Sequence, residues 1–383
     1  MATPTFTRRV VGELDNSPFN CEMNTFFQVG DINHDGRMDI VIAGRDGQMA
    51  WFQNNGQTQD WTRHIVDKVS HQECGGVVYD LTHSGYPDII NGGDYRSDEL
   101  AWWENPGPKG GAWQRRVITH TSHNQFHDEL IGDVTGDGRQ SLIFWNQGGG
   151  ALYWVPLPQD PKQTPWPDIH VIASGMKEKG QPEEGLCIAD IDGDGRNEIV
   201  AGTHWYKYTG VAGKEWEQHQ YAKDYITTVI AVGDIDGDGQ KEIVIAEGDA
   251  CIYGYPQGGK LGWFKPHGDI KAMWQEHRLE DHLLDPHSIQ LGNICGNGHL
   301  DLLVGEIGKR ETLDKEKPRL MVYENDGKGN FTRQIIDEGT GVHHARLADF
   351  RGKGVLDIAS RPLHGPEKWK IFVWFNETGG AVG

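Results

Sequence analysis

Three histidines stand at equivalent places in a recurring loop pattern. His127, His287 and His343 each lie six residues before an Asp- or Asn-rich glycine loop, and Glu184 holds the same place before a fourth loop. An imidazole titrates near neutral pH, so it can take or give a proton at a reacting centre. Three histidines and a glutamate at one repeated position are unusual for packing and predict acid–base chemistry. The alternative is that these residues are ordinary polar side chains at the rim of the fold, in contact with solvent.

Cationic and aromatic residues occur on neighbouring loops of the same pattern. The candidates for substrate binding are Arg45, Tyr95, Arg96, Glu184, His204, Trp205, His344 and His364, and Arg361 joins the three histidines as a candidate catalytic residue. An arginine can hold a carboxylate through two hydrogen bonds, and an aromatic ring offers a flat apolar face to a sugar. With a histidine to remove the proton alpha to the carboxylate, this mixture suits an acidic carbohydrate as substrate.

The glycine loops themselves could bind calcium. Three of them carry four oxygen-bearing side chains: Asp31, Asn33, Asp35 and Asp39; Asp190, Asp192, Asp194 and Glu198; and Asp234, Asp236, Asp238 and Glu242. Calcium takes six to eight oxygens, so backbone carbonyls and water would complete each shell. We expect structural Ca²⁺ in at least one loop. The alternative is that the loops are Asx turns without a metal.

The loops belong to a unit that recurs seven times. An apolar run, the glycine loop and a second apolar run are followed by an aromatic run such as MAWFQN and a fourth run such as WTRHIVD. The first loop positions are residues 31, 80, 133, 190, 234, 293 and 349, which lie 44 to 59 residues apart. This spacing is typical of a propeller blade of four strands.

The seventh unit lacks a fourth run after FVWFNE, whereas a matching segment, FTRRVVG, begins at Phe6. A strand from the N-terminus can therefore complete the last blade and leave no unpaired seam. We predict an all-β fold: a single seven-bladed β-propeller domain over residues 1–383, with four-stranded blades and the N-terminal strand closing the ring.

In such a propeller the acidic loops lie on one face, and the crossovers between blades lie on the other. The histidine positions fall on the crossover face, where equivalent residues of all blades form one ring at the mouth of the channel. We expect the active site there. A transition metal is a weaker alternative, because imidazole suits zinc or copper but blades 3, 6 and 7 should hold their histidines too far apart for one compact site.

Composition excludes several classes of partner. The net charge of −20 argues against binding nucleic acid or an anionic membrane through bulk charge, and no apolar run is long enough to span a bilayer. Five cysteines without a CxxC pair indicate no disulfide framework. We expect a monomer. The first ten residues lack the apolar stretch of a signal peptide, but the acidic charge and the calcium loops favour a secreted or periplasmic location.

Segments such as GDINHDGRMDIVIAG from Gly30 and GDIDGDGQKEIVIAE from Gly233 resemble the FG-GAP/VCBS repeat family, whose members form β-propellers. Within that family the chain looks most like propeller polysaccharide lyases that cleave rhamnosyl-(1→4)-glucuronate ends. It also resembles the propeller half of aldos-2-ulose dehydratase. The resemblance implies cleavage of a glycosidic bond to a uronate by β-elimination. It matches no residue beyond the repeats, so the roles given above rest on position.

A non-catalytic carbohydrate-binding propeller and a protein-interaction propeller are the main alternatives. A lectin would repeat its binding residues in several equivalent pockets. Here the three histidines have unlike neighbours, which favours one central site. A hydrolase is a further alternative, since its two carboxylates could come from the glutamates near the crossover face, which are Glu73, Glu183, Glu184, Glu247 and Glu306.

Overall fold

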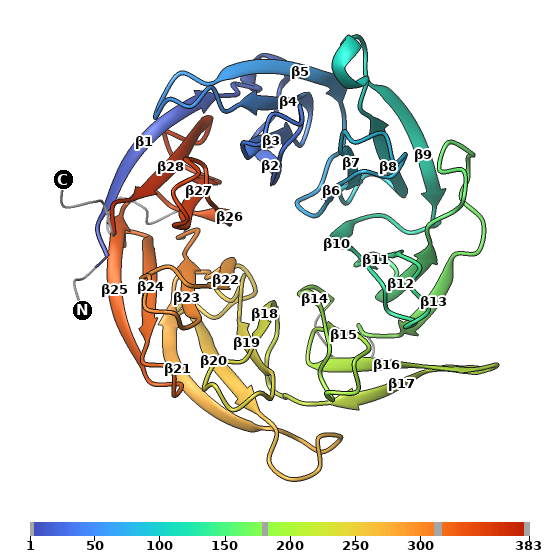
Figure 1. Cartoon of the computed structure of the whole chain (residues 1–383), viewed down its shortest axis with the longest axis vertical. Helices are drawn as coiled ribbons and strands as arrows, with labels where there is room; N and C mark the ends of the chain where they lie inside the picture. The colour runs from blue at the N-terminus through green and yellow to red at the C-terminus, as the bar shows by residue number, and fades with distance from the viewer. Residues whose placement is uncertain (1–3, 178–182, 310–315, 379–383) are drawn as a thin grey trace.

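The computed structural model describes residues 4–177, 183–309 and 316–378. These residues form seven four-stranded antiparallel sheets arranged around a central channel (Figure 1). Within these residues, the only helical segments are two short 3₁₀ turns, η1 (Ser17–Phe19) and η2 (Gly107–Lys109). The prediction of an all-β, seven-bladed propeller is confirmed. Within the described residues, no helix has the length and apolar character needed to cross a membrane.

Each blade runs from an innermost strand at the channel to an outermost strand at the rim. Blades 1 to 3 consist of β2 (Asn24–Gly30), β3 (Asp39–Gly44), β4 (Gly47–Gln53) and β5 (Thr62–Val69); β6 (Val77–Tyr79), β7 (Asp88–Gly92), β8 (Glu99–Glu104) and β9 (Gln114–His120); and β10 (Phe126–Gly132), β11 (Ser141–Asn146), β12 (Ala151–Pro156) and β13 (His170–Ser174). Blades 4 and 5 consist of β14 (Leu186–Ala189), β15 (Glu198–Ala201), β16 (His204–Val211) and β17 (Lys214–Gln220); and β18 (Val229–Gly233), β19 (Glu242–Ala246), β20 (Gly259–Lys265) and β21 (Gln275–Leu283). Blades 6 and 7 consist of β22 (Ser288–Gly292), β23 (Asp301–Gly305), β24 (Arg319–Asn325) and β25 (Phe331–Glu338); and β26 (His343–Ala348), β27 (Asp357–Arg361), β28 (Lys370–Asn376) and β1 (Phe6–Glu13).

The N-terminal strand closes the ring, as the sequence predicts. β1 pairs antiparallel with β28, from Phe6 opposite Asn376 to Glu13 opposite Lys370. The first and last strands of the chain therefore share one blade, and Figure 1 shows β1 beside β28.

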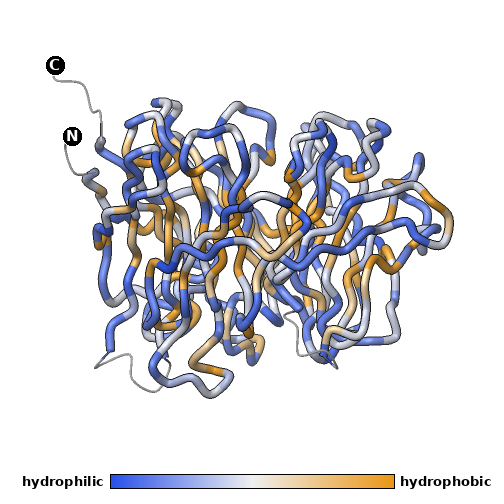
Figure 2. The backbone as a smooth tube through the Cα atoms, turned by 90° about the horizontal axis from the view of Figure 1, so that it is seen from below, coloured by the Kyte–Doolittle hydropathy of each residue, from blue (hydrophilic) through white to orange (hydrophobic). Residues whose placement is uncertain are grey.

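Hydrophobic packing joins the blades in pairs. The described residues contain seven apolar clusters, and each lies between two neighbouring blades. At the closure, Phe27 and Phe52 of blade 1 pack with Val373 and Phe375 of blade 7. Apolar residues follow the strands, whereas hydrophilic residues gather in the loops of the two faces (Figure 2). Because burial of one such side chain is worth about 1.5–3 kcal/mol, each interface is a substantial source of stability.

A buried carboxylate lies at the start of the second strand in every blade except the third, where Ser141 stands. The Asp39 carboxylate accepts hydrogen bonds from the backbone N–H groups of Ile32 at 3.1 Å and Asn54 at 2.8 Å. The Asn54 amide then donates to the carbonyl of Phe350 in blade 7, at 2.7 Å. Three other asparagines make the same bond to the preceding blade: Asn105 to Ile32, Asn325 to Ile235 and Asn376 to Ile294. These amides tie neighbouring blades together on the acidic-loop face.

Replacing Asn54 should weaken this tie measurably. In Asn54→Ala the buried carbonyl of Phe350 loses its donor, which costs about 1–3 kcal/mol of unfolding free energy. Denaturant unfolding measures the loss. Asn55→Ala is the matched control, since the exposed Asn55 amide bonds only within its own turn, to the carbonyl of Asp60. Equal effects of the two changes would show that the cross-blade bond contributes nothing.

Candidate functional site

The side chains of the predicted ring of histidines contact one another across the channel. His127 lies in β10, His287 directly precedes β22, and His343 and His344 begin β26. The ring centroids of His287 and His343 are 4.7 Å apart, those of His343 and His344 4.4 Å, and those of His127 and His287 5.8 Å. The expectation that blades 3, 6 and 7 hold their histidines too far apart for one compact site is therefore wrong. We call His127, His287, His343 and His344 the imidazole cluster.

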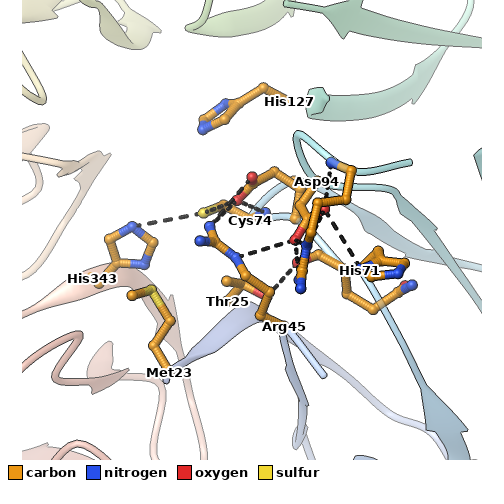
Figure 3. A network of polar contacts seen from close by, with 12 residues as sticks. Met23, Thr25, Arg45, His71, Cys74, Asp94, His127 and His343 are labelled. Carbon is orange, nitrogen blue, oxygen red and sulfur yellow. Dashed lines mark hydrogen bonds and ion pairs between the residues drawn. The ribbon is translucent and has the colours of Figure 1, made fainter. Parts of the chain in front are cut away.

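The imidazole cluster is a constriction of the channel, where we expected an open mouth. Its four residues are only 2–6% exposed. The other positions of the predicted ring, Thr25, Cys74, Glu184 and Thr228, are buried or nearly so. Figure 3 shows His127 and His343 facing this constriction together with Cys74. The side chains meet because the first residues of the innermost strands converge on the axis.

A cavity of about 540 Å³ begins at the imidazole cluster and follows the innermost strands toward the acidic loops. His287 and His344 line it, and so do Asp128, Glu129 and Arg346. The remaining lining includes Gln28, Gln290 and apolar residues such as Leu130 and Leu291. Burial raises the pKa of Glu129 to about 8, so this carboxyl is protonated and neutral at pH 7. The volume of the cavity suits a small ligand, such as one or two sugar rings.

Two histidines of the cluster are paired with carboxylates. His127 Nδ1 lies 3.1 Å from Asp128, and its Nε2 lies 3.6 Å from Glu184. His287 Nε2 lies 3.6 Å from Asp249. Burial disfavours both imidazolium ions, but the carboxylates outweigh it, so the pKa of His127 is well above its usual value and the pKa of His287 is raised. Both rings are stabilised as cations.

The other two histidines are neutral. Burial and the neighbouring cationic groups hold the pKa of His343 and of His344 well below the usual range. The Arg361 guanidinium, which can only donate, lies 3.0 Å from His343 Nδ1. His343 therefore carries its proton on Nε2. The buried Nδ1 of His344 has no hydrogen-bond partner within the described residues.

Arg346 is a cavity residue that the sequence interpretation missed. Its Nε donates to Gln28 Oε1 at 2.9 Å and its Nη1 to the carbonyl of Ala345 at 3.1 Å. Among the described residues no carboxylate lies within ion-pair distance of its guanidinium, and burial lowers its pKa to about 10. The signal was available: the position three residues before each glycine loop includes Gln28, Leu130, Gln290 and Arg346, which all line the cavity.

Arg45, Arg96 and Tyr95 do lie together, but both arginines already pair with carboxylates of the protein. Arg45 contacts Asp94 at 3.6 Å (Figure 3) and Glu73 at 3.2 Å. Arg96 contacts Asp94 at 2.5 Å. Both guanidinium groups lie over the ring of Tyr95, which is 58% exposed. None of the three lines the cavity. An incoming uronate would have to compete with these carboxylates for either arginine.

Three further candidates lie away from the cavity. Trp205 is fully buried in the apolar cluster between blades 4 and 5, where it packs on His219, so the expectation that it stacks on a sugar is corrected. His204 is buried beside the Thr203 hydroxyl, at 3.1 Å. His364 lies close enough to Asp249 to contribute to the lowered pKa of that carboxyl, although burial opposes this shift.

Cations of the chain itself occupy the three acidic loops. Lys207 contacts Asp192, Asp194 at 2.6 Å and Glu198 at 3.4 Å. Lys265 contacts the corresponding Asp236, Asp238 and Glu242, and Arg37 contacts Asp35 at 2.7 Å. Of the four predicted ligands in each loop, the last (Asp39, Glu198 or Glu242) also accepts a backbone N–H of its own loop.

The aspartate sets still suit a hard cation. The carboxylates of Asp190, Asp192 and Asp194 offer oxygens within 4.8 Å of one another, and so do those of Asp234, Asp236 and Asp238. Carboxylate oxygens are the ligands that calcium prefers. A calcium ion would have to displace the lysine ammonium from either set. Calcium binding therefore stays a prediction.

Comparison with known proteins agrees with the fold. The family model described as FG-GAP-like repeat matches residues 31–91 and 190–245, so the chain carries such repeats. No curated protein matches the sequence. Among solved structures, the rhamnogalacturonan lyase YesW is 14% identical with a TM-score of 0.53, over 92% of this chain and 71% of its own.

Propellers of other kinds are similar to the same degree. BBS1N, solved in complex with ARL6DN, is 10% identical with a TM-score of 0.54, over 97% of this chain and 96% of its own. The V. cholerae biofilm matrix protein Bap1 is 11% identical with a TM-score of 0.50, over 98% and 92%. At these identities the likeness concerns the fold, and the fold alone does not assign a function.

Removing Lys207 should expose the calcium dependence of its loop. In Lys207→Met, Asp192 loses its counterion and Asp194 keeps only Arg196, at 2.7 Å, so the melting temperature should fall in chelator and recover in millimolar Ca²⁺. The recovery should exceed the calcium effect on the unchanged protein, because calcium need not displace the ammonium. Lys214→Met, at an exposed lysine of the same blade, is the control. Equal calcium shifts in all three proteins would contradict the prediction.

Proposed function

We propose that the protein is a lyase that cleaves a glycosidic bond to a uronate by β-elimination, for example the bond between rhamnose and glucuronate. The observation that carries the proposal is the arrangement of three side chains around one cavity. Arg346 faces it without a carboxylate partner among the described residues, and His287 and His344 form the wall beside it. A cation and two imidazoles of different character are the groups that elimination next to a carboxylate requires.

Arg346 is the residue proposed to hold the uronate carboxylate. The guanidinium is partly buried, and the Asp128 carboxylate of the same cavity lies beyond ion-pair distance, so an incoming carboxylate can pair with it directly. The positive charge also stabilises the enolate that develops when the alpha proton leaves. Arg45 and Arg96, the first candidates, are less suited because each already contacts two carboxylates.

His344 is the proposed base, and His287 the proposed acid. The unpartnered Nδ1 of His344 takes the proton from C5 of the uronate, and the C5–H electrons form the C4–C5 double bond. The C4–O bond breaks, and the imidazolium of His287, stabilised by Asp249, gives its proton to the leaving oxygen. The products are a 4,5-unsaturated uronate and a sugar with a free hydroxyl group.

His343 and Arg361 take supporting roles in this scheme, although their positions first indicated catalysis. Arg361 is fully buried and its guanidinium holds His343 Nδ1. His343 stacks on His344 with ring centroids 4.4 Å apart. The pair therefore fixes the orientation of the proposed base. His127, held by Asp128, packs against His287 from the opposite side of the channel.

The direct test offers the protein a panel of uronate-containing and neutral polysaccharides. A rise in the ultraviolet absorbance of the unsaturated product on acidic substrates alone supports the lyase. Binding to acidic glycans without any such rise would identify a carbohydrate-binding propeller, and the absence of both would leave a protein partner. Acidic polysaccharides of this kind lie outside cells, which is consistent with the expected secreted or periplasmic location.

Arg346→Gln should remove most of the activity. We expect kcat/KM to fall by about 10²–10³, because the variant loses electrostatic stabilisation of the developing enolate. The rate of absorbance increase measures it. Arg116→Gln, which breaks a rim ion pair with Glu104, is the control and should leave the rate unchanged. An active Arg346→Gln enzyme would exclude this residue from carboxylate binding.

His344→Gln should lower kcat by about 10²–10⁴, as expected for loss of a general base. Gln keeps a polar side chain of similar length but cannot accept the proton. His343→Gln should have a smaller effect, since His343 positions the base without touching the substrate. The same absorbance assay compares the two rates, and circular dichroism confirms the fold. A greater loss in His343→Gln than in His344→Gln would reverse the assignment.

A further inference from the structure

We infer that the constriction of the channel binds one divalent transition metal ion through His127, His287 and His344. Each residue offers a ring nitrogen, and these three nitrogens lie within 4.8 Å of one another. Around a tetrahedral zinc ion with metal–nitrogen distances of about 2.0–2.1 Å, neighbouring nitrogens are roughly 3.3 Å apart. Small rotations of three side chains would close the difference.

Unsatisfied nitrogens point to a missing ligand at this place. Nδ1 of His287 and Nδ1 of His344 are buried and have no hydrogen-bond partner within the described residues. Buried polar atoms are rarely left alone, and an unpartnered one calls for a bound ion or water. Two such atoms from different blades lie on rings whose centroids are 5.1 Å apart. The two rings are stacked with 17° between their planes, so rotation of the side chains would bring both nitrogens to one ion.

His127 is already held as a metal ligand would be. Its Nδ1 lies 3.1 Å from Asp128, and Asp128 also accepts the backbone N–H of Gly185 at 2.7 Å. A carboxylate on one ring nitrogen fixes the orientation of the imidazole. The metal would take Nε2, which lies 3.6 Å from Glu184, in place of the proton that the two carboxylates stabilise there. The site therefore combines three imidazole ligands with a supporting carboxylate.

The donor set selects the kind of metal. Imidazole nitrogens suit zinc, cobalt, nickel and copper, whereas calcium and magnesium require oxygens. The constriction is thus chemically distinct from the acidic loops, whose ligands are carboxylates. A second group, Cys74, His343 and His344, adjoins the first and shares His344 with it, so thiol and imidazole donors continue around the same constriction.

Metal binding at the constriction has one consequence for the activity, and this consequence rests on the proposed function. The Nδ1 lone pair of His344 that would take the substrate proton is the one that would bind the metal. Metal binding and elimination therefore exclude each other at this site. A bound transition metal ion would keep the lyase inactive, and its removal by a chelator would restore the activity.

Co²⁺ is the probe for the site, because it replaces zinc and absorbs visible light. Metal-free protein, with the acidic loops saturated by Ca²⁺, is titrated with Co²⁺ and then with Zn²⁺. We expect d–d bands of tetrahedral cobalt that saturate at one ion per chain and disappear when Zn²⁺ displaces it. His287→Gln and His344→Gln should each abolish the bands. Asp128→Asn should weaken binding by about 10- to 100-fold.

His277→Gln is the matched control, because His277 stacks on Trp263 in an outermost strand and should leave Co²⁺ binding intact. Circular dichroism and melting temperature check the fold of every variant. Absence of saturable Co²⁺ binding, or bands that persist in both His287→Gln and His344→Gln, would overturn the site. The titration reads metal directly, so it stands if no glycan is cleaved. If cleavage is found, activity that Zn²⁺ leaves unchanged would overturn the exclusion.

Discussion

Closure of the ring is the constraint on which the site depends. β1 completes the sheet of β28, and the apolar cluster between blades 7 and 1 then matches the other six interfaces. With the ring closed, the seven innermost strands lie at a fixed distance from one axis. Residues that are more than 200 positions apart in sequence, such as His127 and His343, are then held across one narrow channel. The cross-blade asparagine bonds keep this radius on the acidic-loop face.

In a narrow channel the charged and polar side chains lie close together, so each one shifts the pKa of its neighbours. His127 and His287 gain carboxylates, whereas His343, His344, Arg346 and Arg361 do not. Burial and neighbouring cationic groups keep the two unpaired histidines neutral, and burial lowers the pKa of each of these arginines to about 10. The cavity wall around Arg346 and His287 thus carries more cationic than anionic groups, with Asp128 as the one ionised carboxylate in the described lining, in a protein whose net charge is −20. An anionic ligand fits that local imbalance.

The fold could be predicted from the sequence because a regular repeat implies a regular arrangement of structural units. Seven loops at nearly regular spacing imply seven blades, and a missing fourth strand in the last unit identifies its replacement at Phe6. Equal offsets from the loops also placed His127, His287 and His343 in one ring. What the offsets do not contain is the radius of that ring. The histidines were therefore judged too far apart, although their side chains meet.

The individual misses have equally physical causes. Trp205 occupies the second position of β16, and alternation along that strand turns its ring into the interface between blades 4 and 5. A tryptophan beside a loop looks exposed in a sequence, but the neighbouring blade covers it. Arg346 lies inside β26, whereas functional side chains usually lie on the loops at strand ends, so its sequence position does not by itself indicate a site. In a closed propeller the middle of an innermost strand also faces solvent, through the channel.

The chain separates its structural charges from its chemical ones. On the acidic-loop face, Lys207, Lys265 and Arg351 each neutralise carboxylates that would otherwise repel one another in a tight turn. These cations let the loops fold even where no metal is present. In the channel the opposite holds, because Arg346 and the Nδ1 atoms of His287 and His344 have no such partners within the described residues. Stability favours satisfying every buried polar group, so groups that stay unsatisfied at the centre of a well-packed ring mark the place where a ligand completes the structure.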